Sequence, residues 1–249
     1  MVDIVQKRFG LLGRNINYSF SKGYFTDKFN NENFEGCTYE NFDIQEIDAF
    51  AEIIKNTPDL KGLNVTIPYK EAVIPFLDKL SKKAALIGAV NTIKITKKGK
   101  LKGYNTDYYG FKKSLQPLLK NHHKKALILG TGGASKGVAF ALDELDIPYT
   151  FVSREAKENA IDYDRINTTT FHNYQIIINS TPVGTSPNTE AFPLIPYKYF
   201  TKNHIAFDLI YNPAETQFLK KAKEQGAQIK NGLDMLIFQA EKAWDIWNK

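Results

Sequence analysis

Hydrophobic residues in the second half of the chain form short continuous runs separated by helical patterns. The runs within Ala126–Leu129 and Gln175–Asn179 predict strands buried on both faces, as in parallel sheets. Further strands are predicted at Tyr149–Val152 and Ile205–Ile210. One face of an intervening helix is formed by Val138, Ala141, Leu142 and Leu145. This alternation predicts a doubly wound α/β domain.

The first half of the chain also alternates between strand and helix patterns, with shorter elements. Helical spacing covers residues 19–29 and 47–54. The predicted strands are Phe9–Leu12, Cys37–Ile44, Gly62–Ile67, Val90–Thr96 and Leu101–Tyr104. The last two flank residues 97–100, which predict a hairpin turn. We therefore expect a second α/β domain in this half.

The last segment has the clearest helical period in the chain. Its apolar residues recur every three or four positions, at Leu233, Leu236, Ile237, Ala240, Trp244 and Trp247. The pattern changes character near Tyr104–Asp107. We therefore expect an α/β protein of two domains, residues 1–104 and 105–232, with the helix at 233–249 returning to the first domain.

Composition places the chain among ordinary globular proteins. Its 249 residues are 43% hydrophobic and 24% charged, which argues against disorder. A single cysteine, Cys37, allows no internal disulfide, and the four histidines lack metal-ligand spacing. The net charge of +6 suits acidic small molecules, whereas the scattered basic residues carry no nucleic-acid motif. With no signal peptide or spanning segment apparent, we expect a cytoplasmic protein without a metal.

A glycine-rich turn follows the first buried strand of the second domain. Gly130, Thr131, Gly132, Gly133 and Ala134 lie between that strand and a predicted helix. Glycines let the backbone approach a pyrophosphate, and the helix N-terminus supplies N–H donors. The motif is an incomplete GxGxxG, so a tight strand-to-helix turn without a ligand is the alternative. The context favours a dinucleotide site.

The end of the next strand is where an adenosine ribose is expected. Ser153 and Arg154 lie there, and Lys157 follows one turn later. A basic residue at this point accommodates a 2′-phosphate, whereas NAD sites usually carry an acidic residue. Charges of a solvated loop are the alternative interpretation, and Glu155 weakens the case. The residues favour NADP over NAD.

Polar residues of the first domain gather where its strands end. Asn64 and Thr66 share one strand face, and Lys70 follows the Pro68 break. Further polar residues follow Val90 and Tyr104, namely Asn91, Thr92, Asn105, Thr106 and Asp107. Their amides, hydroxyls, amine and carboxylate suit a polyhydroxylated ligand. Each residue alone also fits a helix cap or a solvated surface, and spacing does not bring the segments together.

Eight segments in this order resemble the shikimate dehydrogenase family. They are FGLLGRNINYSFS (9–21), GLNVTIPYK (62–70), GAVNT (88–92), GYNTDYYGF (103–111), LGTGGASKG (129–137), NSTPVGT (179–185), DLIYNP (208–213) and GLDMLIFQA (232–240). The resemblance implies an N-terminal α/β substrate-binding domain and a Rossmann-like NADP-binding domain. The implied reaction is the reversible reduction of 3-dehydroshikimate to shikimate by NADPH, on the pathway to chorismate and aromatic amino acids.

The same resemblance implies a role for individual residues. Lys70 and Asp107 correspond to the catalytic pair, and Ser19 and Ser21 to the ligands of the substrate carboxylate. The remaining substrate-binding positions are Asn64, Thr66, Asn91, Asn105, Tyr211 and Gln239. The cofactor-binding positions are the five residues of the glycine turn with Ser153, Arg154, Lys157, Thr181, Leu209 and Gly232.

Several departures from the family pattern keep alternatives open. Asn15 and Lys22 replace common prolines, and Tyr18 replaces a histidine, which predicts a differently shaped loop before the serines. Glu155 replaces a threonine, which predicts reduced discrimination against NAD. The alternatives are a broader quinate/shikimate dehydrogenase using NAD or NADP, or a non-catalytic nucleotide-binding regulator. We expect a monomer or homodimer with no membrane or nucleic-acid partner.

Overall fold

The computed structural model describes residues 6–17, 19–154 and 160–249. It divides into two compact units. Unit 1 contains the described residues up to Thr106 together with Ala240–Lys249, and unit 2 contains Asp107–Gln239. The predicted domains place the boundaries after Tyr104 and Gly232 instead. Among the described residues, no helix is both long and apolar enough to cross a membrane.

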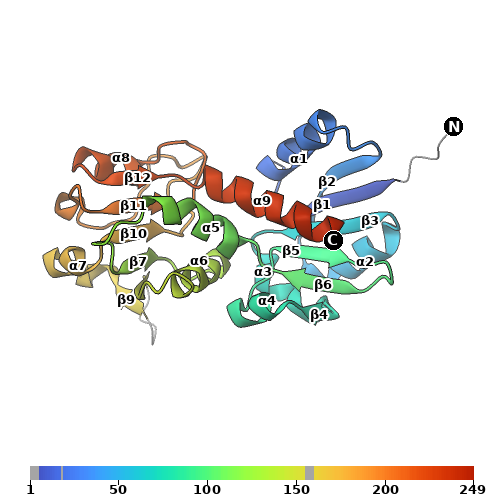
Figure 1. The fold of residues 1–249 in the computed structure, drawn as a ribbon, viewed down its shortest axis with the longest axis horizontal. Helices are drawn as coiled ribbons and strands as arrows, with labels where there is room; N and C mark the ends of the chain where they lie inside the picture. Colours follow the sequence, from blue (N-terminus) through green and yellow to red (C-terminus); the bar gives the residue numbers. More distant parts are fainter. Residues whose placement is uncertain (1–5, 18, 155–159) are drawn as a thin grey trace. The chain divides into compact units, whose positions relative to one another are not determined.

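Unit 1 is built on a mixed sheet with the strand order β2-β1-β3-β5-β6-β4 (Figure 1). The strands are β1 (Lys7–Gly13), β2 (Cys37–Asp43), β3 (Leu60–Val65), β4 (Lys79–Leu80), β5 (Thr92–Ile95) and β6 (Leu101–Tyr104). β1 pairs in parallel with β2 and β3, whereas β5 is antiparallel to β3 and β6. The predicted hairpin is therefore present as β5–β6.

Helices cover both faces of this sheet. One face carries α1 (Phe20–Asn31) and the end of α9 (Leu233–Asn248), and the other carries α2 (Phe50–Asn56), α3 (Tyr69–Ala72) and α4 (Lys82–Ile87). Trp247 anchors the end of α9, because its ring stacks on Phe9 at 4.9 Å and its Nε1 donates to the Ile93 carbonyl at 2.9 Å. A Cβ at Gly62 would lie 2.2 Å from that nitrogen, so only glycine fits beneath the indole.

Unit 2 is built on a sheet whose strands are all parallel, in the order β12-β11-β10-β7-β8-β9. The strands are β7 (Ala126–Leu129), β8 (Tyr149–Ser153), β9 (Ala160–Asp162), β10 (Ile176–Asn179), β11 (Ile205–Asp208) and β12 (Gln228–Lys230). The chain adds β8 and β9 on one side of β7 and then β10 on the other. The topological switch point therefore lies between β7 and β10, where α/β sheets bind ligands at the carboxyl ends.

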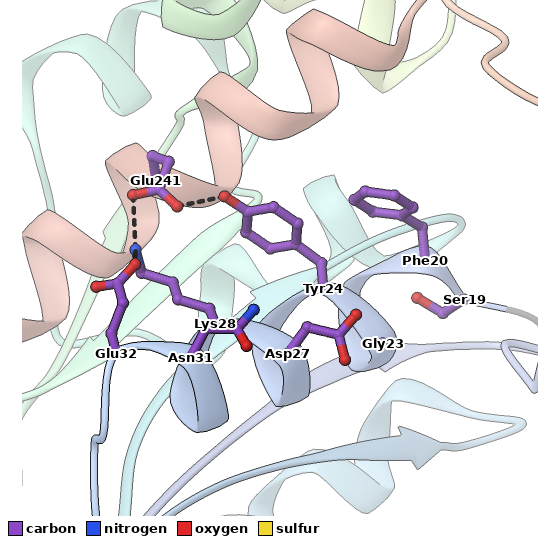
Figure 2. Close-up of a pocket in the computed structure, with 9 residues that line it drawn as sticks. All are labelled: Ser19, Phe20, Gly23, Tyr24, Asp27, Lys28, Asn31, Glu32 and Glu241. Atoms are coloured by element: carbon purple, nitrogen blue, oxygen red, sulfur yellow. Dashed lines mark hydrogen bonds and ion pairs between the residues drawn. The ribbon is translucent and has the colours of Figure 1, made fainter.

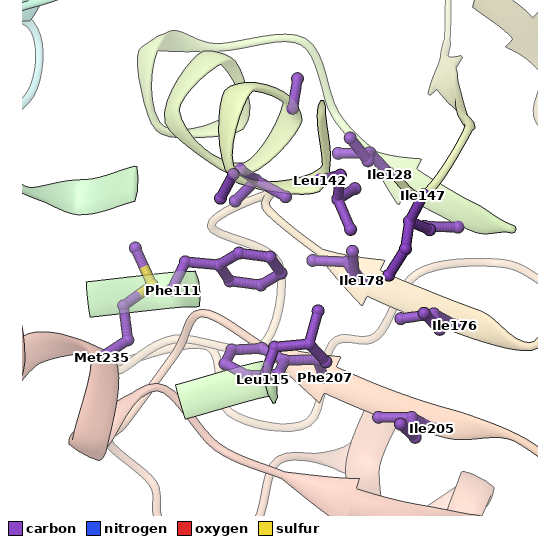
Figure 3. Close-up of a cluster of buried hydrophobic side chains, with 14 residues drawn as sticks. Phe111, Leu115, Ile128, Leu142, Ile147, Ile176, Ile178, Ile205, Phe207 and Met235 are labelled. Carbon is purple, nitrogen blue, oxygen red and sulfur yellow. The ribbon is translucent and has the colours of Figure 1, made fainter. Parts of the chain in front are cut away.

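Two hydrophobic clusters bury the faces of this sheet. Helices α5 (Asp107–Leu115), α6 (Gly133–Asp143) and the start of α9 pack over the cluster in Figure 3, which includes Ile176 and Ile178. α7 (Thr168–Asn173) and α8 (Gln217–Glu224) pack over the other cluster, which includes Ile177. Adjacent residues of β10 thus point to opposite cores, which explains its continuous apolar run.

A buried histidine makes the stability of unit 2 dependent on pH. His123 Nδ1 accepts a hydrogen bond from Lys120 N at 2.9 Å. Burial, and secondarily the charges of His122, Lys120 and His204, lower the pKa of His123 to about 4, against a backbone hydrogen bond at Asn203. The unfolded chain, with a histidine pKa near 6.5, therefore takes up a proton first as the pH falls.

We expect the contribution of His123 to the free energy of unfolding to decrease between about pH 6.5 and pH 4. Urea midpoints measured across this range would check it. Relative to wild type, a His123→Gln variant should gain stability as the pH falls through this range, whereas the exposed His172→Gln control should follow wild type. Equal pH dependence in all three proteins would contradict the assignment.

Candidate active site

The glycine turn of unit 2 has the predicted strand–turn–helix geometry. β7 ends at Leu129, Gly130 has φ +102°, and α6 begins at Gly133 after Gly132 at the N-cap. An added Cβ at Gly130 would lie 2.9 Å from Thr181 Cγ2, whereas a Cβ at Gly132 would meet nothing within 4 Å. The turn therefore leaves open space beside Gly132 at the helix N-terminus, as a phosphate requires.

Ser135 stands where a complete GxGxxG motif has its third glycine. Its side chain is buried, and its hydroxyl donates to the Gly132 carbonyl at 2.6 Å. This hydrogen bond joins the first turn of α6 to the residue at its N-cap. The departure from the motif thus has a structural explanation. Thr131 lies in the glycine turn, and Ala134 lies in the first turn of α6.

The carboxyl ends of β10 and β11 are joined by a buried network that the sequence pattern did not predict. Asn179 Nδ2 donates to Asp208 Oδ1 at 3.1 Å, and Asn179 Oδ1 accepts from Thr181 N and Thr181 Oγ1 at 3.1 and 2.6 Å. Thr216 Oγ1 and Ile210 N also donate to Asp208, at 2.6 and 3.0 Å. Burial raises the pKa of Asp208 to about 7, although these three donors oppose the shift. The network fixes Thr181 beside the glycine turn.

Two further predicted cofactor positions meet at the start of α9. Gly232 N donates to the Ile210 carbonyl at 3.0 Å. A Cβ at Gly232 would lie 2.0 Å from the Leu209 carbonyl oxygen, so the close approach of the two segments requires glycine. Leu209 and Tyr211 are half-buried in this region.

The strand end predicted to bind the adenosine ribose is β8. Ser153 is its last residue and is buried, and Arg154 follows with its side chain exposed. Arg154 is therefore accessible to a ligand. Lys157 and Glu155 lie outside the described residues.

Most of the predicted polar residues of unit 1 lie at one end of its strands, where β3 and β6 end and β5 begins. Asn64 is the fifth residue of β3, and its side chain is opposite to Leu63 and Val65, which pack in the α2–α4 core. Tyr39 Oη donates to Asn64 Oδ1 at 2.8 Å, and Asn64 Nδ2 donates to the Asn91 carbonyl at 3.4 Å. Asn64 is thus buried and hydrogen-bonded within the protein rather than on a solvated face.

Asn91 links this edge to the start of α5. Its Oδ1 accepts from Thr106 N at 2.6 Å and from Thr92 Oγ1 at 3.1 Å, and its Nδ2 donates to Thr106 Oγ1 at 3.0 Å. Asn105 Nδ2 donates to the Ala89 carbonyl at 3.0 Å. Thr92 and Thr106 are both fully buried. These bonds fix the backbone immediately before Asp107.

The proposed catalytic residues belong to different units. Lys70 is the second residue of α3 and is half-buried, and its carbonyl accepts from Val90 N at 2.7 Å. Asp107 is the first residue of α5 and is buried. Thr66 is half-buried after β3, and its N donates to the Leu12 carbonyl at 2.9 Å. Gln239 is buried on α9 and donates to the Leu236 carbonyl at 2.9 Å.

The serine segment begins α1. Ser19 is the N-cap, and its Oγ accepts from Ser21 N at 3.2 Å. A pocket of about 510 Å³ extends from Ser19 along α1, and Figure 2 shows the residues that line it. Glu241 closes its far end, where it pairs with Lys28 and accepts from Tyr24. These contacts hold α1 against the end of α9.

The loop before Ser19 departs from the family pattern for a physical reason. Asn15 has φ +56°, a conformation closed to proline, whose φ is near −65°. Asp43 holds the loop by accepting from Asn15 N at 2.9 Å and Ile16 N at 3.0 Å. Asn41 Nδ2 donates to the Ile16 carbonyl at 3.0 Å. The loop is therefore shaped by side chains of β2. Tyr18 lies outside the described residues.

The donor types in the described parts of the chain do not form a metal centre. No group of three or more His, Cys, Asp or Glu residues is placed to hold a metal ion in residues 6–17, 19–154 and 160–249. The site residues are instead amides, hydroxyls, one lysine and one aspartate. Unit 2 has a parallel sheet with a glycine turn at its switch point, where α/β proteins bind nucleotides. Unit 1 has a sheet with amides and hydroxyls at the end of its strands. Together these features define a two-domain nucleotide-dependent α/β enzyme.

Comparison with known proteins identifies the family. The shikimate dehydrogenase substrate binding domain family model matches residues 11–93. A protein from Methanococcus maripaludis named shikimate dehydrogenase (NADP(+)) is 37% identical, over 99% of this chain and 94% of its own. One from Clostridium botulinum with the same name is 39% identical, over 96% of this chain and 95% of its own. The chain belongs to the shikimate dehydrogenase family.

A solved structure supports the same conclusion. The crystal structure of shikimate 5-dehydrogenase from Thermus thermophilus in complex with NADP(H) and shikimate has a TM-score of 0.86 and 31% identity. The match covers 97% of this chain and 93% of that one. The predictions of the family, the fold class, an NADP-dependent oxidoreductase and its cofactor are confirmed. The individual site residues stay predictions.

Proposed function

We propose that this protein catalyses the reversible reduction of 3-dehydroshikimate to shikimate by NADPH, with Lys70 and Asp107 as the catalytic pair. The observation that carries the proposal is the buried chain of amides and hydroxyls that leads through Asn91 to Thr106, the residue before Asp107. Such a constellation suits a ring with several hydroxyl groups. We further propose a cytoplasmic protein that works as a monomer or homodimer.

The substrate residues divide by the group they would bind. Ser19 and Ser21 would donate hydrogen bonds to the carboxylate. Hydroxyls and ring substituents would be bound by Thr66, Asn91, Asn105 and Gln239, with Tyr211 nearby. Asn64 supports them from within the protein, because its amide is held by Tyr39 and the Asn91 carbonyl.

The residues of unit 2 fit a dinucleotide. The pyrophosphate would lie against the turn Gly130–Ala134, where the space beside Gly132 is open. Ser153 and Arg154 would bind the ribose phosphate, with Lys157 predicted to assist. Thr181, Leu209 and Gly232 would line the nicotinamide side. When bound, the cofactor supplies the hydride chemistry, and the protein supplies position and charge.

Lys70 and Asp107 would carry out the proton transfer. In the reductive direction, the Lys70 ammonium would donate a proton to the oxygen of the substrate carbonyl as hydride arrives. In the oxidative direction, neutral Lys70 would accept that proton. Asp107 would orient the ammonium and accept a hydrogen bond from the reacting hydroxyl.

Replacing Arg154 tests the cofactor assignment. We expect Arg154→Ala to raise the KM for NADP by roughly 10- to 100-fold and to leave the KM for NAD unchanged, because a charge-assisted bond to the 2′-phosphate is lost. Steady-state kinetics with both cofactors would measure the ratio. Arg165→Ala is the matched control, since Arg165 is an exposed arginine of the same unit. Parallel loss with both cofactors would argue against a 2′-phosphate contact.

An assay of four substrate pairs tests the function. Purified protein would be supplied with shikimate or quinate and with NADP or NAD, while nicotinamide absorbance is followed. We expect turnover chiefly with shikimate and NADP. Strong turnover with quinate or NAD would indicate a broader quinate/shikimate dehydrogenase. No turnover by folded protein would favour a non-catalytic nucleotide-binding regulator.

A further inference from the structure

Tyr39 lies on β2, outside the eight segments that carry the family resemblance in the sequence. Its ring is buried and stacks on Phe25 with centroids 4.6 Å apart. Its hydroxyl donates to Asn64 Oδ1 at 2.8 Å. Burial raises the pKa of Tyr39 well above its ordinary value, so the phenol stays protonated and remains a donor. One hydroxyl of β2 therefore holds the amide that supports the proposed substrate residues.

The Asn91 carbonyl, which can only accept, and the Tyr39 hydroxyl together determine which way the Asn64 amide points. An amide has an acceptor and a donor end of nearly equal size, so its partners select its orientation. With Oδ1 held by Tyr39, Nδ2 faces the Asn91 carbonyl at 3.4 Å and Thr92 Oγ1 at 3.5 Å. The hydrogen of Thr92 is then directed to Asn91 Oδ1 at 3.1 Å.

The hydrogen bonds continue from Asn91 to Thr106, the residue before Asp107. Asn91 Oδ1 accepts from Thr106 N, and Asn91 Nδ2 donates to Thr106 Oγ1. Each group in this series accepts from one neighbour and donates to another, which strengthens the whole series. A reversed Asn64 amide would place its carbonyl against the Asn91 carbonyl, so Oδ1 faces Tyr39 and takes its donor from that hydroxyl.

We infer that Tyr39 is a positioning residue for substrate recognition, whose hydroxyl satisfies Asn64 Oδ1 and so holds the Asn64 amide against the Asn91 carbonyl and Thr92 Oγ1. It acts through these side chains. The inference rests on the proposed function, since Asn91 is one of its substrate ligands. It adds a residue of β2 that lies outside the eight segments of the family resemblance.

A Tyr39→Phe variant tests this role, because it removes the hydroxyl and keeps the stacked ring. We expect the KM for shikimate to rise by about 5- to 30-fold, the loss associated with one hydrogen bond and an unpaired buried carbonyl. The kcat should change less than KM, and the KM for NADP should not change. A merely structural role would lower the melting temperature without this selective change in KM.

Tyr174→Phe is the matched control. Its phenol bonds Thr150 Oγ1 at 2.8 Å in unit 2, so both Michaelis constants should stay at their wild-type values. A double-mutant cycle with Asn64→Ala tests the route: if Tyr39 acts through Asn64, adding Tyr39→Phe should raise KM little further. Should Tyr39→Phe fail to fold, Thr92→Val removes the next hydroxyl of the series and should raise the same KM.

Two results would overturn the inference while the proposed function stands. One is an unchanged KM for shikimate in folded Tyr39→Phe or, if that variant fails to fold, in folded Thr92→Val. The other is full additivity of Tyr39→Phe and Asn64→Ala. Failure of the proposed function is a separate observation, because it would appear as absent shikimate turnover in the wild-type protein.

Discussion

A Lys70→Ala enzyme is expected to fold normally and to turn over shikimate about 10²- to 10⁴-fold more slowly than wild type. The lost rate is the contribution of a positioned proton donor and acceptor. The fold should survive because the contact that Lys70 makes with Val90 uses its backbone carbonyl, which alanine retains. Alanine is also the most favourable residue for the short helix α3.

The measurement is kcat at saturating shikimate and NADP, with circular dichroism and thermal unfolding to verify the fold. Lys82→Ala is the matched control, since Lys82 is an exposed lysine at the start of α4 in the same unit. Its kcat should equal that of wild type. A near-normal kcat in folded Lys70→Ala would remove Lys70 from the mechanism.

Replacing Asp107, the proposed partner of Lys70, extends this experiment. Asp107→Asn should lower kcat in the same direction, and the double variant should lose much less than the product of the two single losses, because residues that act as one unit are non-additive. Multiplicative losses would instead mean that Lys70 and Asp107 contribute independently.

Trp247→Ala is expected to destabilise the protein strongly, lowering the free energy of unfolding by about 3–5 kcal/mol. The indole is buried in the core formed by β1, β2, α1 and the end of α9. It also donates to the Ile93 carbonyl, which would be left buried without its donor. The flat space above Gly62, which the indole now fills, would become a cavity.

Urea unfolding followed by far-ultraviolet circular dichroism would measure this loss. Trp244→Ala is the control: Trp244 lies one turn earlier on α9 and is half-buried, so its removal should cost less. An equal loss in the two variants would show that the hydrogen bond and the close approach at Gly62 contribute little.

Local sequence was sufficient for the longer elements and for the position of the glycine turn. The continuous apolar runs of β7 and β10 arise because both faces of the strand are buried, and this is visible without partners. The short strands β4 and β9 carry no such period, because they are defined by pairing with β6 and β8. Helix α5 ends at Leu115, since Pro117 follows.

The sequence by itself therefore determined the fold class, the family, and the residue types available for binding NADP and shikimate. Only the tertiary structure decided which buried polar groups form hydrogen bonds with these residues. Tyr39 and Asn64 are 25 positions apart, and Asn179 and Asp208 are 29 apart. Hydrophobic periodicity reports which face of a strand is buried, but not which buried donor meets which acceptor, because sheet order and register set that pairing.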